Sequence, residues 1–384
     1  MKKQLPLEGV TVLEFAQFMA GPSAGLKMAD LGARVIKIER PGSGEAGRNI
    51  ALKNIYIDES SMVFHTANRN KESYGANLKD PEDLKKIKQL IAQADVMTHN
   101  FRPGVMEKIG LDYETVKAIN PRIVYGVVSG YGPTGPWAKK PGQDLLIQSL
   151  SGFVNLSGNA SDGPTASGLA TSDIFTGVHL VQGILAALIK REKTGEGAKI
   201  EVSLLESTID IQFEVITNYL NNGNIIPERA NQGNAHAYLR APYGIYQTKN
   251  GYIAIAVAPL DEICAAMNLE LPQAYQDKNT WFEKRDEIMD WLRPIIKENT
   301  TDYWLNIFDK KNLAVSDIFT YKQLFENEGF KAVQMMQEVE TSDNITMQTT
   351  RCPIHIDGKR IFSRKSAPKA GEDNAKIEKE FNLC

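Results

Sequence analysis

The sequence has 384 residues, of which 42% are hydrophobic, 24% charged and 8% aromatic. These proportions are close to those of average globular proteins, so they exclude a disordered, collagen-like or fibrous chain. The 44 basic and 47 acidic residues give a formal net charge of −3, which supplies no basic field for a phosphate backbone and argues against nucleic acid as the main partner.

The first 130 residues alternate between short β-branched runs and helical stretches. Strands are predicted at Val10–Phe15 and Arg34–Glu39, with a helix over Ser23–Leu31 that Pro22 starts and Gly32 stops. The alternation continues with a helix from Pro81 to about Ala94, a strand at Asp95–Thr98, a helix near Tyr113–Ile119 and a strand at Ile123–Val128. Strands separated by helices in this way predict a parallel sheet with crossover helices.

The middle of the chain contains its most apolar helical pattern. A Pro- and Gly-rich loop, Gly132–Pro136, and a helical stretch at Asp144–Phe153 come first. The loop Ser157–Gly168 then leads into the apolar helix Asp173–Arg191, and Ala198–Ser203 is a predicted strand. No uninterrupted apolar run approaches the ~20 residues that span a bilayer, so no membrane segment is predicted.

After about Asn221 the pattern becomes that of a smaller, separate α+β domain. Two strands are predicted at Gly244–Thr248 and Tyr252–Val257, joined by a turn at Asn250-Gly251. Helical stretches follow at 262–268, 283–297 and 302–310. The charged segment Glu372–Glu380 is interpreted as a solvated end of the chain.

The markers of several enzyme classes are missing or out of context. Gly42–Gly47 matches GxGxxG, but Arg40-Pro41 separates it from the preceding strand and no helix start follows, so a flexible loop is predicted rather than an NAD or FAD site. The five histidines have no metal-binding spacing, and His179 is interpreted as a satisfied core residue. The three scattered cysteines fit a reducing compartment, so we expect a cytoplasmic protein.

Asp173 stands where a Gly-rich loop meets the start of the apolar helix. A carboxylate in a first helical turn faces free backbone N–H groups and the positive end of the helix dipole, which favours its ionised form. An ionised carboxylate can act as a nucleophile, but Asp is also a common helix cap. Position alone leaves both roles open.

Basic residues recur where strands are predicted to end. Arg40 follows the second strand, Lys71 closes the segment Asn68–Lys71, and Arg102 lies in Asn100–Gly104. The carboxyl ends of parallel strands share one edge, where ligands bind, so three cations there could hold a nucleotide diphosphate. Solvated surface positions are an equally good interpretation of these residues.

Several motifs in a fixed order together resemble the class III CoA-transferase family, of the formyl-CoA and carnitinyl-CoA transferase type. The resemblance covers nearly the whole chain, and no single motif decides it. In chain order the motifs are Ala20–Pro22, Leu31–Gly42, Asn68–Lys71, Asn100–Gly104, Asn120–Tyr125, Ser129–Pro136, the segment around Asp173, and Ala186–Gly195. The same fold family contains α-methylacyl-CoA racemases.

The resemblance implies a reaction and a substrate site. CoA would move from an acyl-CoA donor to a free carboxylic acid, with Asp173 as the catalytic nucleophile that forms an aspartyl anhydride or thioester. Coenzyme A would be the carrier, and its nucleotide would be lined by Arg40, Asn70, Lys71 and Arg102. No metal, NAD or ATP is expected, because the energy of the thioester is conserved.

Three further residues are implied as secondary active-site candidates. Asp144 matches a second acidic residue of some transferases. Some members have a glutamine two residues before Gly-Pro, where this chain has Met19, with Gln17 nearby. Racemases typically carry His-Asp where this chain has Gln143-Asp144, and a glutamine cannot exchange a proton near neutral pH, which favours the transferase. A racemase or epimerase, and a catalytically silent CoA-binding protein, stay open as alternatives.

The resemblance also implies an α/β architecture and a partner. A large Rossmann-like parallel-sheet domain would carry an inserted smaller α+β domain, and two chains would interlock as a homodimer. The predicted divisions are 1–205 for the N-terminal part of the large CoA-binding domain, 206–224 for a linker, 225–325 for the small domain and 326–384 for the return to the large domain.

Overall fold

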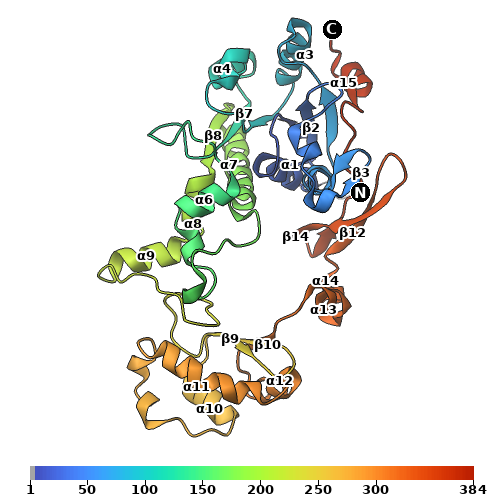
Figure 1. Cartoon of the computed structure of the whole chain (residues 1–384). Helices are drawn as coiled ribbons and strands as arrows, with labels where there is room; N and C mark the ends of the chain where they lie inside the picture. Colours follow the sequence, from blue (N-terminus) through green and yellow to red (C-terminus); the bar gives the residue numbers. More distant parts are fainter. Residues whose placement is uncertain (1–4) are drawn as a thin grey trace. The chain divides into compact units, whose positions relative to one another are not determined.

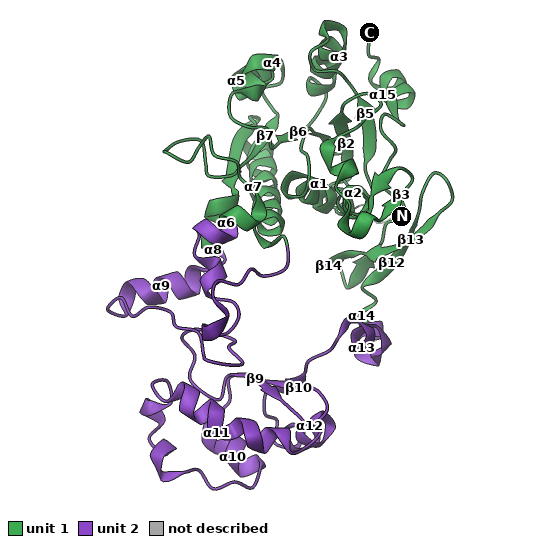
Figure 2. Ribbon diagram, viewed as in Figure 1, with its two compact units in different colours: residues 1–147, 170–210, 333–384 green, residues 148–169, 211–332 purple. Residues whose placement is uncertain are grey.

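The computed structural model describes residues 5–384, which form two compact units. Unit 1 contains the residues up to Ile147, then Ala170–Asp210 and Val333–Cys384; unit 2 contains Gln148–Leu169 and Ile211–Ala332 (Figure 2). The segment Gln148–Leu169 thus groups with later residues, whereas the sequence places it in the large domain. Its backbone explains the difference, because the N–H of Ala160 donates to the carbonyl of Ala230 at 3.0 Å.

Unit 1 is built on a six-stranded sheet in which every neighbouring pair is parallel (Figure 1). The order β5-β2-β1-β6-β7-β8 comprises Glu72–Gly75, Arg34–Glu39, Thr11–Glu14, Val96–His99, Val124–Ser129 and Ala198–Ser203. The predicted parallel α/β sheet is therefore confirmed. The chain moves from β1 to β2 on one side and later returns to β6 on the other, so the order reverses between β1 and β6. Such a reversal marks where open α/β sheets bind ligands, outside the carboxyl ends of the strands.

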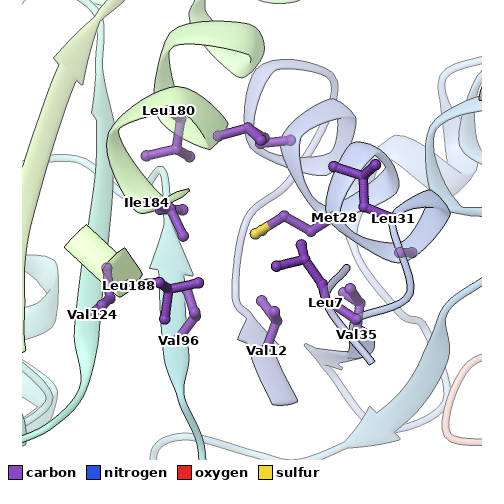
Figure 3. Packing of buried hydrophobic residues seen from close by; sticks show 14 of the residues in the cluster. Leu7, Val12, Met28, Leu31, Val35, Val96, Val124, Leu180, Ile184 and Leu188 are labelled. Carbon is purple, nitrogen blue, oxygen red and sulfur yellow. The ribbon is translucent and has the colours of Figure 1, made fainter. Parts of the chain in front are cut away.

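One face of the sheet is covered by α1 (Ala20–Asp30) and α7 (Thr171–Thr194), which pack against each other. Their apolar side chains join those of the strands in one buried cluster, shown in Figure 3, which includes Val12, Met28 and Ile184. By length and composition alone α7 could cross a bilayer; in this fold nine of its residues are buried. The helix extends slightly beyond the predicted Asp173–Arg191 and ends at Gly195, which has a left-handed φ of 77°.

The opposite face is covered by α3 (Pro81–Ile91), α5 (Tyr113–Ile119) and α15 (Asn374–Phe381). Ile377 of α15 is fully buried, and Lys376 donates to Glu72 on the edge strand at 2.6 Å. The interpretation of Glu372–Glu380 as a solvated end is therefore wrong. Its charges lie on the outer side of a docked helix, while one apolar residue in the middle enters the core.

The remaining elements of unit 1 are short. They are the 3₁₀ turns η1 (Ala46–Asn49) and η2 (Leu52–Asn54), β3 (Tyr56–Ile57), β4 (Ser60–Ser61), α2 (Met62–Asn68), α4 (Val105–Ile109), α8 (Leu204–Asp210), β12 (Met336–Glu340), β13 (Thr346–Thr350), β14 (Cys352–Ile356) and β15 (Lys359–Ile361). Helix α6 (Asp144–Leu150) begins in unit 1. Helix α1 starts two residues before the predicted Pro22, which a first turn tolerates because its N–H groups have no helical partner.

Unit 2 contains a three-stranded antiparallel sheet with the order β11-β10-β9. Its core is formed around the fully buried Trp281 and the buried Trp304. The elements are η3 (Phe153–Asn155), η4 (Ala160–Asp162), α9 (Phe213–Asn221), β9 (Gly244–Gln247), β10 (Tyr252–Ile255), α10 (Leu260–Ala266), η5 (Gln273–Tyr275), η6 (Lys278–Thr280), α11 (Arg285–Lys297), α12 (Thr301–Lys310), β11 (Val315–Asp317), α13 (Tyr321–Glu326) and α14 (Glu328–Val333). The two predicted strands and three predicted helices all lie within a few residues of these bounds.

Candidate active site

Asp173 is the third residue of α7, whose N-terminus lies at the carboxyl edge of the sheet because α7 precedes the parallel strand β8. The residue before the helix, Ala170, provides no side-chain cap. Instead Asp144, at the start of α6, accepts a hydrogen bond from the N–H of Asp173 at 3.2 Å. Within residues 5–384 no hydrogen bond reaches the Asp173 carboxylate itself. The capping role thus belongs to Asp144, and the carboxylate of Asp173 is left for another purpose.

Two effects raise the pKa of Asp173 to about 7. The larger is burial, which penalises the charged carboxylate, and the second is repulsion by the neighbouring carboxylate of Asp144. The helix N-terminus favours the charged form of Asp173, as the sequence indicates, but burial and the charge of Asp144 outweigh it. The sequence shows the helix end but neither the loss of solvent nor the second acid. A carboxyl group with this pKa changes its charge near neutral pH, which is typical of functional sites.

A glycine brings the start of α7 close to the start of α1. A Cβ added at Gly177 would lie 2.8 Å from the carbonyl oxygen of Ala20 and would overlap the hydroxyl of Ser23. Only glycine allows the two helices to approach this closely. Since Asp173 lies about one helical turn before Gly177, it is held beside the N-terminus of α1.

The turn Ala16–Met19, which joins β1 to α1, lies at the point where the strand order reverses. The side-chain amide of Asn100, just beyond β6, accepts from the N–H of Gln17 at 2.8 Å and donates to its carbonyl at 2.7 Å. The carboxyl ends of β1 and β6 are thereby tied together. Gln17 and Met19 are both partly exposed. Phe18 between them is 47% exposed, and the sequence analysis did not single it out.

Arg40 and Arg102 occupy the predicted edge. Arg40 directly follows β2 and is exposed, and Arg102 follows β6 and is exposed as well. Arg102 also lines a cavity of about 220 Å³ together with His99 and Tyr113. Burial lowers the pKa of His99 to about 4, so that its ring is neutral at physiological pH.

Lys71 and Asn70 do not lie at that edge. Lys71 precedes β5 rather than following a strand, so this part of the prediction is wrong. Its ammonium is fully buried, donates to Glu14, Asn68 and the carbonyl of Pro22 at 2.9 Å, and has its pKa lowered by burial to about 8. Asn70 donates to the carbonyl of Ala29 near the far end of α1. Whether either residue also contacts CoA stays a prediction.

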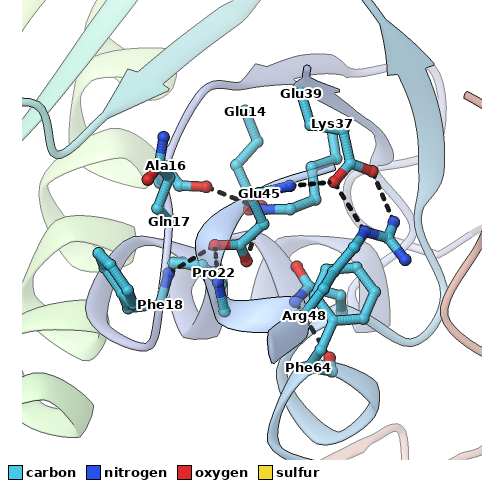
Figure 4. Close-up of polar contacts among 12 residues, drawn as sticks. Glu14, Ala16, Gln17, Phe18, Pro22, Lys37, Glu39, Glu45, Arg48 and Phe64 are labelled. Carbon is cyan, nitrogen blue, oxygen red and sulfur yellow. Dashed lines mark hydrogen bonds and ion pairs between the residues drawn. The ribbon is translucent and has the colours of Figure 1, made fainter. Parts of the chain in front are cut away.

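Beneath the turn lies a cluster of buried charges that hydropathy patterns cannot show (Figure 4). Lys37 is fully buried and lies 3.1 Å from Glu14 and 3.4 Å from Glu45. Arg48 forms a two-bond ion pair with Glu39, at 2.9 and 2.6 Å. Buried ion pairs are costly to desolvate and breaking one is strongly destabilising, so this cluster is a rigid support.

Two other sequence interpretations require correction. Gly42–Gly47 is not a flexible loop, because it leads into η1 and its Glu45 and Gly47 are buried. His179 is not a core residue: its ring is partly exposed and lies 3.0 Å from the hydroxyl of Ser207 and 3.3 Å from the carboxylate of Asp210. In both cases the environment is determined by polar contacts that the sequence does not reveal. The sequence showed only that Gly42–Gly47 is rich in glycine and that His179 has apolar neighbours.

Comparison with known proteins identifies what this chain is similar to. The sequence model of a family described as CoA-transferase family III matches residues 7–374. The chain is 33% identical over 381 residues to the succinyl-CoA:glutarate CoA-transferase of Homo sapiens, covering 98% of this chain and 86% of that protein. It is 31% identical over 388 residues to the acetyl-CoA:oxalate CoA-transferase of Acetobacter aceti, covering 99% and 97%. A crystal structure of a CAIB/BAIF family protein from Brucella suis matches with a TM-score of 0.84 at 32% identity, covering 99% and 100%.

Proposed function

Because the chain belongs to CoA-transferase family III, we propose that it moves CoA between carboxylic acids through a covalent intermediate on Asp173. The protein is a CoA-transferase, and its substrates are an acyl-CoA donor and a free carboxylic acid acceptor. The observation that carries the proposal is the carboxylate of Asp173, which is partly buried, unbonded among the described residues and close to the sheet's binding edge.

The proposed reaction proceeds by exchange at three carbonyl carbons, those of the donor acyl group, of Asp173 and of the acceptor acyl group. The ionised carboxylate of Asp173 attacks the donor thioester, the C–S bond breaks, and a mixed anhydride and CoA thiolate form. The thiolate then attacks the aspartyl carbonyl and releases the donor acid, leaving an aspartyl-CoA thioester. The acceptor carboxylate attacks this thioester to give a second anhydride, whose acyl carbon takes back the thiolate as product acyl-CoA. Each step exchanges one activated acyl bond for another, so Asp173 is regenerated without an external energy source.

Asp144 has a supporting part in this proposal. Its oxygen holds the N–H of Asp173, which fixes the first turn of α7, and its charge raises the pKa of the nucleophile. A carboxylate that is poorly solvated and has a pKa near neutrality is a stronger nucleophile than a surface carboxylate and is still ionised at slightly alkaline pH.

Arg40 and Arg102 are proposed to hold the phosphates of CoA. They follow β2 and β6, which lie on either side of β1, so their backbones are about 10 Å apart at a spacing of about 4.8 Å per strand. Exposed guanidinium groups at that separation suit a ligand that carries both a diphosphate and a further phosphate. The predicted CoA contacts of Asn70 and Lys71 are kept as part of the proposal.

The acids are proposed to be short dicarboxylates. This follows the names of the relatives, which specify glutarate, succinyl and oxalate groups for those proteins. Oxalyl, succinyl and glutaryl thioesters are therefore the first donors to test against the corresponding free acids.

The larger assembly is also a proposal. We propose that unit 2 is the inserted smaller domain and that two chains interlock as a homodimer. The homodimer is supported by the apolar surface around α9 and the chain after it, where Phe213 is 68%, Leu220 65% and Ile226 67% exposed. A cytoplasmic location is proposed from the three cysteines, which are unpaired in the described chain.

The test is to trap the intermediate. Incubation with a succinyl or glutaryl thioester and hydroxylamine converts an activated aspartyl group into a hydroxamate, which peptide mass spectrometry locates. We expect the modification on Asp173 and a loss of at least about 10³-fold in transfer with Asp173→Ala. Asp302→Ala, which alters an exposed Asp in the first turn of α12, is the matched control and keeps full activity. Full transfer by Asp173→Ala would overturn the mechanism.

A further inference from the structure

The turn Ala16–Met19 is held by the side chains of Lys37, Glu45 and Asn100, the first two of which are labelled in Figure 4. Lys37 on β2 donates to the carbonyl of Ala16, the first residue of the turn, at 2.8 Å. Asn100, just beyond β6, binds the backbone N–H and the carbonyl of Gln17, the second residue of the turn. Glu45, in the loop after β2, accepts from the N–H of Phe18 at 3.0 Å. Three successive residues are thus fixed by hydrogen bonds that the turn itself does not supply.

Phe18 has a backbone conformation that its residue type disfavours. Its φ of 66° lies in the left-handed region, which is strained for a residue other than glycine. Burial of the ring cannot offset this cost, because the side chain is 47% exposed. In Figure 4 the ring points away from the carboxylate that holds its N–H. Strain of this kind persists where the surroundings determine the conformation, and it is concentrated at functional sites.

Glu45 is buried and binds several groups at once, which keeps its hydrogen bond to the turn in place. Its side chain is nearly fully buried, and one carboxylate oxygen is shared between the N–H groups of Phe18 and Gly47, at 3.0 and 2.9 Å. Its other oxygen lies 3.4 Å from the ammonium of Lys37. Its own N–H donates to Glu39 at 2.9 Å. The loop, the strand and the turn therefore share one buried carboxylate.

The position of the turn connects this support to the reaction. It lies where the strand order reverses, and it leads into α1, against which the first turns of α7 are packed at Gly177. Asp173 and the exposed ring of Phe18 are therefore both near the N-terminus of α1. An apolar ring at this position can cover the methylene groups of an acyl chain, which are more stable when buried than when exposed to water.

On this basis we propose that Phe18 is a specificity-determining residue that packs on the methylene chain of the acyl group, and that Glu45 is a positioning residue that acts through Phe18. The proposal rests on the transferase function above. It commits to a class of substrate: acyl groups with two or more methylenes, such as glutaryl, use the ring, whereas acetyl gains little from it.

The first experiment compares kcat/KM for glutaryl-CoA and acetyl-CoA. We expect Phe18→Ala to lower the glutaryl value about 10-fold and to change the acetyl value less than about 3-fold, since three buried methylenes are partly uncovered. Glu45→Ala reproduces the same selective loss through KM rather than kcat, and Glu45→Gln, which keeps an acceptor oxygen, restores most of it. An equal loss for both thioesters with Phe18→Ala would overturn the proposal.

A double variant tests whether Glu45 acts through Phe18. In the Phe18→Ala background, Glu45→Ala should reduce kcat/KM by less than about 2-fold further, because the ring that it positions is already absent. Additive losses would mean that Glu45 has a separate role. The matched control is Glu72→Gln, a buried acid that binds Arg34 and Lys376 and has no contact with the turn. It should leave the ratio of the two kcat/KM values unchanged.

A readout without turnover separates this proposal from the transferase function. Hydrogen exchange of the peptide containing residues 15–20 measures protection of the Phe18 amide, and Glu45→Ala should accelerate it at least about 10-fold while Glu72→Gln does not. Unchanged protection with Glu45→Ala would refute the positioning role, even in an active enzyme. If the wild type transferred CoA from no thioester, the function would be wrong while the exchange result still decided the role of Glu45.

Discussion

Three effects determine whether the carboxyl group of Asp173 is ionised, and two of them oppose the third. The N-terminus of α7 favours the charged form, but burial and the carboxylate of Asp144 both favour the neutral form and prevail, with a pKa of about 7. The Asp173 carboxyl group is thus about half ionised at neutral pH and fully ionised only at higher pH. Its reactivity and its pH dependence have the same origin, which is a pair of acids with little access to solvent.

This pair predicts the pH profile of the enzyme. The proposed reaction needs ionised Asp173, so kcat/KM should rise with pH and level off above a midpoint near the pKa of about 7. Asp144→Asn removes the like charge, which favours ionisation of Asp173, so the midpoint should move to lower pH by about one unit. Steady-state rates measured between about pH 5 and about pH 9 provide the test.

The control for this profile is Asp162→Asn, which alters an exposed acid in η4, part of unit 2, and should leave the midpoint in place. A midpoint that moves upward in Asp144→Asn would contradict the assignment, because it would mean that Asp144 stabilises the charged form. No movement at all would show that burial alone raises the pKa of Asp173.

For single residues, the sequence indicated where candidate site residues lie in the fold better than it indicated what surrounds their side chains. Asp173, Asp144, Arg40 and Arg102 all lie at the sheet edge or beside it, as the motifs indicated. Lys71 does not, because its charge is neutralised by Glu14 inside the protein. Buried ion pairs have no signature in hydropathy or spacing, since the partner residues are far apart in the sequence. Phe18 was missed for a similar reason. Neither the exposure of its ring nor its left-handed backbone conformation can be recognised in the sequence, where it is one apolar residue among others.

At the scale of elements, the approach of α1 and α7 determines where Asp173 lies. Two glycines of α7 allow a direct comparison. A Cβ at Gly177 would meet the backbone carbonyl of Ala20 at 2.8 Å, whereas a Cβ at Gly183 would meet the Cγ2 methyl of Ile200 at 2.6 Å. Rotation about the Cα–Cβ bond of Ile200 can move this methyl group aside, whereas the backbone of α1 cannot move without displacing the helix.

We therefore expect Gly177→Ala to destabilise the protein by roughly 2 kcal/mol more than Gly183→Ala. Both substitutions gain about 1 kcal/mol of helix propensity, so the difference reports on the clash alone. Urea denaturation of the two variants measures it. Gly177→Ala should also reduce transfer by displacing the start of α7, while Gly183→Ala should not. Equal stability of the two variants would show that the helices separate at no cost.

The elements themselves were largely predictable. Strands β1, β2, β6, β7 and β8 and the helices between them fall within a few residues of their predicted positions, because alternating apolar runs and helix-stop residues are local signals. The edge strand β5 was not predicted, since it contains buried Glu72 and Ser73 rather than β-branched residues. Helix α15 was missed because only Ile377 marks its buried side. Strand β5 depends on pairing with β2, 36 positions earlier in the chain, and α15 depends on contacts with β5 that join residues about 300 positions apart.

At the scale of the whole molecule, the apolar residues left exposed on α9 and the chain after it indicate a partner. A monomer with this surface would tend to aggregate. We expect the protein to have about twice the chain mass of 42.6 kDa when measured by light scattering after size exclusion, independent of dilution to nanomolar concentration. Phe213→Glu should either cause aggregation or lower the measured mass of the assembly toward that of a monomer. Lys297→Glu on α11 should have neither effect. A monodisperse monomer of the wild type would contradict the proposed homodimer.

The docking of α15 has a consequence for biosynthesis. The face of the sheet that it covers belongs to strands translated at the beginning of the chain, and the helix itself comes from residues 374–381, after all of unit 2. A ribosome therefore delivers the whole of unit 2 before it delivers the last helix of unit 1. During that interval α3 and α5 can already cover their part of this sheet face, but the part beside β5 that α15 covers stays exposed, and exposed apolar surface of this kind is prone to aggregation.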